Sequence, residues 1–368
     1  MKILHVGNMA NYAFWIVKKL RENKLDVELL MKKNPKGSAD PIQYDKSLNN
    51  QYPDWIKFYD TNNRFWPLKI IKKMRENYDI LHTYVELPIF ASFSGKKFIA
   101  NVQGSDLREL AFSNSIKGIL LRRAYKKAKA IILPGVEGPS LLEKLKLKNG
   151  IFIPAFTDLK GFTAPINGKN VSNEKLTIFH PSHQLWSIKG NDILIKGFKK
   201  FVENHPNSNL IIVKHGQDSE KSVSLIKKLN LEKNITFLDG TLSTHDLKNM
   251  YYTSDIIADQ FIIGELGGIG REVLSMQKPL LTYCWSNKYK ELLSESPPIA
   301  NASSPEQITE QLMLLSDKKN REKLAHDGYN WIHKYYNPDI ISKKIIILYQ
   351  EILNGEKIEK IKSKILYT

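Results

Sequence analysis

Residues 259–284 place a strand, a glycine-rich loop, a helix and a second strand in direct succession. An apolar run ending at Gln260 leads into a loop with glycines at positions 264, 267, 268 and 270. The loop opens into a helix with Glu272 in its first turn, and Leu280 begins the next strand. Strands joined through a helix lie parallel in one sheet, so this unit directs the chain towards an α/β fold.

The same unit predicts a site for a phosphorylated ligand. Glycines allow the backbone to approach an anion closely, and a helix N-terminus offers unpaired N–H groups with partial positive charge. The carboxylate of Glu272 is placed to accept hydrogen bonds from a ribose. Together these features indicate a nucleotide-sugar site.

Strands and helices alternate on both sides of a polar stretch with Gly161, Pro165 and Gly168. This alternation predicts two doubly wound, Rossmann-like α/β domains facing a cleft. Residues 33–66 break the rhythm and are expected to be irregular. The expected order is an acceptor-side domain, a linker, a nucleotide-sugar-binding domain and helices that pack back on the first domain: 1–156, 157–175, 176–336 and 337–368.

The composition fits a globular enzyme of two domains. The chain has 368 residues, of which 42% are hydrophobic and 25% charged, more than one ordinary core accommodates. Its single cysteine, Cys284, excludes an internal disulfide. The N-terminal stretch turns polar too soon for a signal peptide, and no apolar run approaches membrane-spanning length. We therefore expect a cytoplasmic protein.

The formal net charge of +17 has two interpretations. It attracts an anionic partner, or it reflects solvated lysines with no partner. Basic residues alternate with apolar ones in 67–75 and 115–129, a pattern suited to docking on an anionic membrane surface, here the inner face. The alternative is helices that pack by an apolar stripe and leave a solvated basic face.

A second constellation, His180 to Asp192, follows the first strand of the second domain. Ligands of doubly wound sheets bind outside the carboxyl ends of the strands, so Lys189 is placed to reach a diphosphate. Its ammonium group would neutralise charge on a departing phosphate. The alternative is an ordinary surface lysine before a helix.

These motifs, in this order, resemble the retaining glycosyltransferases of family 4 (glycosyl transferases group 1), which have the GT-B fold. The resemblance extends over almost the whole chain and includes Lys189-Gly190, the segment 267–272 with Lys278-Pro279, and Gln103-Gly104-Ser105-Asp106. It implies a nucleotide-diphosphate sugar donor held mainly by the second domain.

The resemblance also implies roles for single residues. Glu272 matches the glutamate that holds the ribose, and Lys189 matches the phosphate lysine. The loop whose amides face the donor matches Gly267, Gly268, Ile269 and Gly270.

The sequence departs from the family pattern at three places. Family members have seven residues between two motif glutamates, whereas Glu265 and Glu272 have six between them, so Gly264 occupies the first position. Glu265 is therefore a candidate catalytic residue or a solvent-facing loop residue. His183 stands where the phosphate partner is often Arg, and supplies fewer donors. Gln103 stands where many members have His.

The first domain contributes five further candidates. Gly7 and Asn8 follow its first strand and are expected to face the donor sugar, although Asn8 could instead cap a helix. Asp106 is placed to orient an acceptor hydroxyl or to cap the next helix. His82 and Gln103 are acceptor-side candidates, and His82 has the alternative of a core histidine.

The expected function is a metal-independent, retaining transfer of a hexosyl-type group to a glycan or lipid-linked acceptor in cell-envelope, polysaccharide or glycolipid synthesis. The chain has no Asp-x-Asp triplet to hold a divalent ion, so neither metal nor cofactor is expected. Two alternatives remain: a sugar-nucleotide epimerase of the same fold, and a non-catalytic protein that binds a nucleotide sugar or anionic polymer. Nucleic-acid binding would rest on charge alone.

Overall fold

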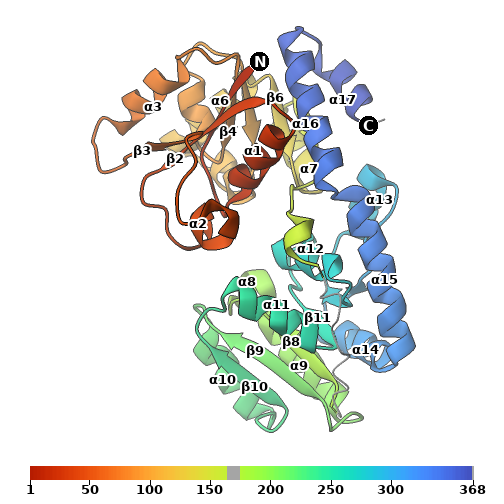
Figure 1. The fold of residues 1–368 in the computed structure, drawn as a ribbon. Helices are drawn as coiled ribbons and strands as arrows, with labels where there is room; N and C mark the ends of the chain where they lie inside the picture. Colours follow the sequence, from red (N-terminus) through yellow and green to blue (C-terminus); the bar gives the residue numbers. More distant parts are fainter. Residues whose placement is uncertain (164–174, 367–368) are drawn as a thin grey trace. The chain divides into compact units, whose positions relative to one another are not determined.

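A computed structural model describes residues 1–163 and 175–366 (Figure 1). The chain divides into two compact units. The first comprises Met1–Thr157 together with Tyr336–Thr368, and the second comprises Asp158–Tyr335. Most of the expected linker lies outside the described residues. Its start forms a short helix, Leu159–Gly161 (η4), which belongs to the second unit.

The first unit is built on a seven-stranded sheet in the order β3-β2-β1-β4-β5-β6-β7, with every neighbouring pair parallel. Its strands are β1 (Lys2–Val6), β2 (Asp26–Lys32), β3 (Ile56–Tyr59), β4 (Ile80–Tyr84), β5 (Phe98–Asn101), β6 (Ala130–Leu133) and β7 (Gly150–Phe152). Its α-helices are α1 (Tyr12–Glu22), α2 (Pro41–Tyr44), α3 (Trp66–Met74), α4 (Pro88–Ala91), α5 (Ser105–Arg108), α6 (Ile116–Lys127), α7 (Gly138–Lys144), α16 (Pro338–Leu353) and α17 (Ile358–Leu366). Short 3-10 helices are η1 (Gly37–Ala39), η2 (Lys46–Leu48) and η3 (Leu110–Phe112).

Successive residues of β1 point to opposite faces of this sheet, as in any strand. Ile3 joins a core with α1, α16 and α17, whereas Leu4 joins a core with α3, α6 and α7. The C-terminal helices therefore complete one face of the first unit, and α16 lies beside α1 (Figure 1). Lys19 of α1 pairs with Asp339 of α16 at 2.5 Å.

The second unit repeats the plan with six parallel strands in the order β10-β9-β8-β11-β12-β13. They are β8 (Thr177–His180), β9 (Asn209–Lys214), β10 (Ile235–Asp239), β11 (Ile256–Ala258), β12 (Leu280–Thr282) and β13 (Ala300–Asn301). The helices are α8 (Trp186–Lys189), α9 (Asn191–Val202), α10 (Ser219–Lys228), α11 (Thr244–Thr253), α12 (Gly268–Ser275), α13 (Ser286–Leu293), α14 (Pro305–Ser316) and α15 (Lys318–Tyr335). The predicted doubly wound α/β class is confirmed for both sheets.

The prediction that all of 33–66 is irregular is wrong. Strand β3 lies within it and forms the outer edge of the described sheet, paired only with β2. The strand is short and two of its four residues are exposed, so it lacks the apolar run by which buried parallel strands are recognised.

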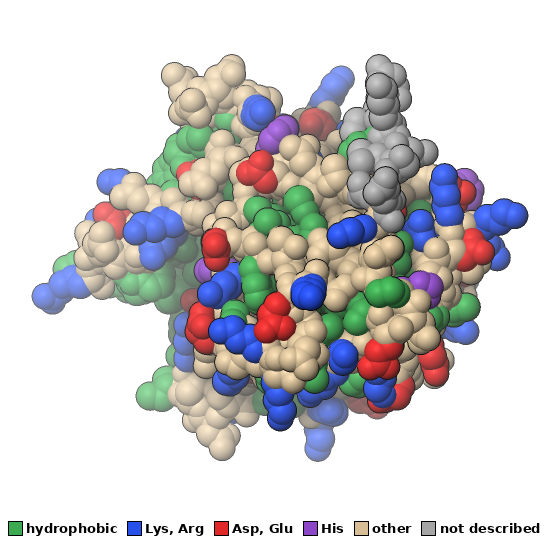
Figure 2. Space-filling model, turned by 90° about the horizontal axis from the view of Figure 1, so that it is seen from below, with side chains coloured by type: hydrophobic (Ala, Val, Ile, Leu, Met, Phe, Trp, Pro, Cys, Tyr) green, Lys and Arg blue, Asp and Glu red, His purple; other side chains and the backbone are tan. Residues whose placement is uncertain are grey.

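Positive charge is not gathered in one patch on the face that Figure 2 shows. Lys and Arg side chains there are interspersed with Asp and Glu. Among the described residues, no helix combines the length and apolar character needed to cross a bilayer.

Candidate functional site

The strand order of the second unit reverses between β8 and β11, which are direct neighbours in the sheet. At such a switch point, connections leave towards opposite faces and open a crevice at the carboxyl ends of the strands. The loops that meet there are 181–185, after β8, and 259–267, after β11. Both predicted donor motifs therefore reach one place.

Asn191, the first residue of α9, fixes the loop after β8. Its side-chain oxygen accepts the N–H of Leu185 at 3.0 Å, and its amide donates to His183 O at 3.3 Å and His180 Nε2 at 2.8 Å. His180 Nδ1 then carries the proton and donates to Ala258 O at 2.9 Å. Burial lowers the pKa of His180 to about 4, so the ring is neutral. The loop before Lys189 is thus anchored to β11.

Lys189 points to the start of the loop after β11. Its Nζ lies 3.3 Å from Asp259 Oδ1 and 3.2 Å from Gln260 Oε1, and Ser182 Oγ donates to the same Asp259 oxygen at 2.6 Å. The Asp259 side chain is 2% exposed and that of Lys189 14%. The ion pair thus holds the ammonium group of Lys189 at the switch point of the sheet.

Asp259 and Gln260 are the site residues that sequence reasoning missed. The apolar pattern assigns them to the preceding strand, but β11 ends at Ala258. An acidic residue directly after an apolar strand is the signal that could have found them. Position 267 lies beside Asp259, since a Cβ there would be 3.3 Å from Asp259 Oδ2.

The glycine loop is held by its carbonyl groups. Gln260 Nε2 donates to Ile263 O at 3.2 Å and Glu265 O at 2.6 Å, and Arg271 Nη1 donates to Leu266 O at 2.7 Å. Arg271 therefore has a structural contact within the loop.

The amide groups at the start of α12 are used differently. The first backbone hydrogen bond of helix α12 runs from the N–H of Arg271 to the carbonyl oxygen of Gly267, at 3.2 Å. The amides of Gly268, Ile269 and Gly270 precede it and so have no partner within the helix, the condition in which helix N-termini bind phosphate.

Glu272 is half-buried in the first turn region of α12, and its Oε2 accepts the hydroxyl proton of Tyr251 at 3.2 Å. Burial raises the pKa of Glu272 to about 7, with a further contribution from the negative charge of Asp259. Tyr251 and nearby Arg271 oppose this rise. Hydrogen bonds from hydroxyl donors would stabilise the ionised form of this carboxyl group.

Gly264 packs against Trp285, and the contact explains the glycine. A Cβ at position 264 would clash with the Trp285 ring. The backbone N–H of Trp285 donates to the carbonyl oxygen of Gly264 at 2.9 Å. The position has no room for a glutamate while Trp285 is in place. Glu265 is half-buried in the neighbouring loop, and its catalytic role stays a prediction.

His183 is exposed at the same edge. Partial burial lowers its pKa, and the positive charges of Lys189 and His215 lower it further. A neutral His183 supplies one N–H donor beside Lys189.

Residues 164–331 match the family model for glycosyl transferases group 1. The chain is 26% identical over 208 residues to an uncharacterized glycosyltransferase of Methanocaldococcus jannaschii, covering 48% of this chain and 51% of that protein. It is 28% identical over 189 residues to one of Haemophilus influenzae, covering 51% of each. The chain spans about half the length of these curated relatives.

Solved structures similar to this chain show the GT-B fold. HepE of Anabaena in complex with UDP-glucose has a TM-score of 0.74 at 14% identity, covering 96% of this chain and 100% of that one. Sucrose-phosphate synthase of Thermosynechococcus elongatus has a TM-score of 0.70 at 12% identity, covering 97% of this chain and 100% of that one. A glycosyltransferase of Rickettsia africae has a TM-score of 0.69 at 17% identity, covering 96% of this chain and 98% of that one. At such identities the likeness establishes the fold alone.

In the first unit, His82 is a core residue and not an acceptor contact. It is fully buried, and His82 Nε2–H donates to Asn101 Oδ1 at 3.1 Å. Its Nδ1 therefore accepts the hydroxyl of Tyr349 at 2.6 Å. His5 Nε2 then donates to that hydroxyl at 2.9 Å and His5 Nδ1 accepts from Tyr84 at 2.8 Å. This chain of bonds ties α16 to the sheet, so the acceptor assignment of His82 is corrected.

Asp106 also has a structural role in place of the expected catalytic one. It is 2% exposed; its Oδ1 accepts the N–H of Gln103 at 2.9 Å and its Oδ2 the hydroxyl of Tyr125 at 3.0 Å. Both carboxylate oxygens are thus engaged in hydrogen bonds within the first unit. By contrast, the half-buried Gln103 has a buried Nε2 without a hydrogen-bond partner, so it stays an acceptor-side candidate.

Gly7 and Asn8 follow β1 as predicted, but local contacts occupy them. Asn8 Oδ1 accepts the N–H of Phe14 at 3.1 Å and its amide donates to Ala39 O at 3.1 Å, so the alternative of a helix cap applies. Gly7 adopts φ 102°, and a Cβ added there would lie 2.7 Å from Leu87 Cδ1, a packing reason for glycine.

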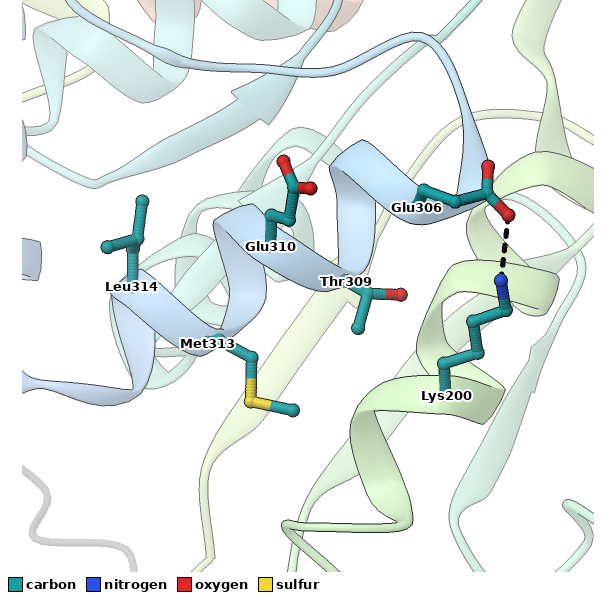
Figure 3. Close-up of a pocket in the computed structure, with 6 residues that line it drawn as sticks. All are labelled: Lys200, Glu306, Thr309, Glu310, Met313 and Leu314. Carbon is teal, nitrogen blue, oxygen red and sulfur yellow. Dashed lines mark hydrogen bonds and ion pairs between the residues drawn. The ribbon is translucent and has the colours of Figure 1, made fainter.

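A pocket of about 710 Å³ lies elsewhere, between α9 and α14 (Figure 3). Lys200 and Glu306 point towards one another across it at 2.7 Å. Lys200 is nine residues along α9 from Asn191, roughly 13 Å at the helical rise. The rest of the pocket's lining, which includes Thr309, Glu310 and Met313, comes from α14. Among the described residues, no three His, Cys, Asp or Glu side chains form a group able to hold a metal ion.

Proposed function

We propose that this glycosyltransferase moves a hexosyl group from a nucleotide-diphosphate sugar to an acceptor hydroxyl with retention. The observation that carries the proposal is the Lys189–Asp259 pair beside the amides of α12 at a switch point. Lys189 and these amides would hold the diphosphate, and Glu272 would accept hydrogen bonds from the ribose. The HepE complex with UDP-glucose makes that sugar nucleotide the first donor to test.

In this reaction the bond from the anomeric carbon to the diphosphate oxygen breaks, and the electron pair stays on the oxygen. The acceptor oxygen bonds to the same face of the anomeric carbon, and its proton passes to the leaving oxygen. Lys189 and the α12 amides stabilise the negative charge that develops there. The proposed mechanism needs no metal or cofactor.

Thermal shifts with nucleotide sugars test the site. Lys189→Ala and Glu272→Ala should remove the donor-induced shift, whereas Lys200→Ala, a surface lysine of the same unit, should keep it. A shift unchanged in both site variants would refute the assignment. Activity that persists in EDTA is expected, and anomeric NMR signals of the product report retention. Conversion of the donor sugar without an acceptor would indicate an epimerase instead, and donor binding without turnover a non-catalytic protein.

We also propose that the first unit docks on the anionic inner face of a membrane, where a lipid-linked envelope acceptor would be met. Helix α4 packs against both α3 and α6, and this layer leaves large apolar side chains exposed among its lysines: Phe65, Leu68, Phe93, Ile116 and Ile119. Apolar insertion and basic attraction are the two components of interfacial binding.

Vesicle flotation tests the docking. Anionic vesicles should retain the protein at low salt, and Leu68→Ser with Ile116→Ser should release it. Equal binding to neutral and anionic vesicles would exclude the electrostatic component. Leu314→Ser, also exposed but in the second unit, serves as the control.

A further inference from the structure

A hollow of about 540 Å³ lies between the edge strand β3 and helix α3 in the first unit. Its volume is in the range of ~300–1,000 Å³ common for small-molecule sites. Trp66 and Ile70 on one face of α3 contribute to its wall, together with Leu30 and Tyr59. Since β3 is the outermost described strand, the hollow opens along an edge of the sheet.

Lysine side chains surround the hollow: Lys33, Lys57, Lys69 and Lys73. In the described parts of the chain, no carboxylate lies within 4 Å of the first three. Lys73 pairs with Glu76 at 2.6 Å and faces Glu28 at 3.9 Å. Asp60 is the acidic residue of the lining, and its Oδ1 accepts the N–H of Asn62 at 2.9 Å. The lining thus carries unneutralised positive charge.

Aromatic rings form the other part of the lining. Tyr59 and Trp66 stack with ring centroids 5.9 Å apart and planes 21° apart, and both are half-buried. Phe58 is 39% exposed at the rim. Half-buried aromatic rings with a polar handle offer flat apolar faces to the C–H faces of sugar rings. A site for a simple anion would need only the lysines, so the aromatic rings favour a ligand that also contains sugar rings.

We propose that this hollow binds a sugar chain bearing carboxylate or phosphate groups, as the acceptor of the proposed transfer or part of it. The lysines would contact the anionic groups while the aromatic rings contact the sugar faces. The inference rests on the proposed function for the role of acceptor, but not for the binding itself.

A lipid surface fits this hollow less well. Its rings are recessed, whereas the exposed Leu68 lies on a different face of α3 from Trp66, Lys69, Ile70 and Lys73. These four follow the i, i+3, i+4, i+7 spacing of one helix face. Helix α3 therefore offers one face to the hollow and another to the proposed membrane surface.

Binding of oligogalacturonate to the full chain, followed by calorimetry, tests the inference. A neutral maltooligosaccharide of equal length, inorganic polyphosphate and anionic vesicles are the comparison probes. The Lys57→Gln/Lys69→Gln double variant should bind oligogalacturonate about tenfold more weakly or worse. The Lys46→Gln/Lys144→Gln double variant, with two exposed lysines of the same unit, should bind as the wild type does.

Variants of Trp66 test the contribution of the aromatic rings in the same binding experiment. Trp66→Ala should weaken oligogalacturonate binding, and Trp66→Phe should retain most of it. If polyphosphate binds as well as the glycan and Trp66→Ala changes nothing, the hollow is a charge trap and the inference fails. It also fails if the lysine variant loses vesicle binding but keeps glycan binding, or if oligogalacturonate does not bind.

The inference and the proposed function can fail separately. The Lys57→Gln/Lys69→Gln variant should keep its UDP-glucose-induced thermal shift, because Lys189 and Glu272 are intact. Loss of glycan binding with that shift retained supports the inference. Glycan binding by a wild-type chain that shows neither donor shift nor transfer would overturn the proposed function alone.

Discussion

Single carboxyl groups set the electrostatics of the predicted donor site. Asp259 accepts hydrogen bonds from both Ser182 and Lys189, and its charge raises the pKa of Glu272. The two acidic residues have different partners: Asp259 pairs with the ammonium group of Lys189, and Glu272 accepts a hydrogen bond from the hydroxyl group of Tyr251.

Glu272 should make stability fall as pH rises. Its folded pKa of about 7 lies above the ordinary 4.5, so the folded state binds the proton more tightly than the unfolded state. The stabilisation is complete below pH 4.5 and is lost as pH rises through 7. After discounting for partial exposure, the free energy of unfolding of wild type should drop by about 1–2 kcal/mol between about pH 5 and 8 relative to Glu272→Gln.

Urea unfolding of the second unit at both pH values measures this difference. UDP-glucose should also bind wild type more tightly at about pH 8 than at pH 6, since ribose hydroxyls favour the ionised carboxylate. Identical pH profiles for wild type and Glu272→Gln would contradict both expectations.

Asp259→Asn should separate stability from donor binding. It leaves the Lys189 charge largely buried and unpaired, which should lower the free energy of unfolding by about 2–3 kcal/mol. The same free charge should increase the shift that UDP-glucose produces. Asp255→Asn, which removes a more exposed partner of Arg321, is the matched control. A smaller donor shift in Asp259→Asn would contradict the prediction.

At the scale of elements, the site depends on how two loops are tied to neighbouring strands. Asn191 holds the loop after β8, and Gln260 holds the loop after β11. Both ties are made by side chains at element ends, so the regular elements position the loops while the loops supply the ligand contacts.

Asn191→Ala should loosen the loop before Lys189. It removes contacts to Leu185, His180 and His183, and should lower stability by about 1–2 kcal/mol while raising hydrogen exchange in 182–189. Donor affinity should fall, since Lys189 is no longer preorganised. Asn234→Ala, which frees the carbonyls of Pro206 and Ser208 ahead of β9, should leave donor affinity intact. Equal loss in both variants would count against the assignment.

At the scale of the whole molecule, the chain returns to its first unit after completing the second. Tyr336–Thr368 belongs to the same compact unit as Met1–Thr157, and Tyr349 of α16 contacts both His5 and His82. Burial lowers the pKa of both histidines. The first unit therefore cannot form its core from the N-terminal segment alone.

Tyr349→Phe should destabilise the first unit by about 2–3 kcal/mol, because both histidines lose a buried hydrogen-bond partner. Depressed pKa values favour the folded state above the unfolded pKa of 6.5, so wild type itself should lose stability as pH falls below it. Calorimetric scans at about pH 7 and 5 report both effects. Tyr52→Phe, which removes one half-buried hydroxyl contact, should change little, and an equal change in both variants would contradict the role of Tyr349.

Sequence reasoning succeeded where a local pattern is sufficient. The alternation of apolar strands and helices predicted the doubly wound class, which the two parallel sheets confirm. The glycine loop between β11 and α12 lies at the switch point, and its role in holding an anion stays a prediction. Strand β3 escaped prediction because an edge strand of four residues, partly exposed, has no distinguishing periodicity. Helix α5 has only four residues, so its sequence does not distinguish a capping Asp106 from a catalytic one.

The sequence by itself determined the fold class and the two motifs that carry Lys189 and Glu272, because strand, glycine and helix-start signals act over a few neighbouring residues. Only the tertiary structure decided what those residues meet. Asp259 is 70 residues from Lys189 in the chain, and Tyr349 is 267 residues from His82. Pairing over such separations depends on sheet order, which fixes the partner of each charge and decides whether a histidine is a ligand or part of the core.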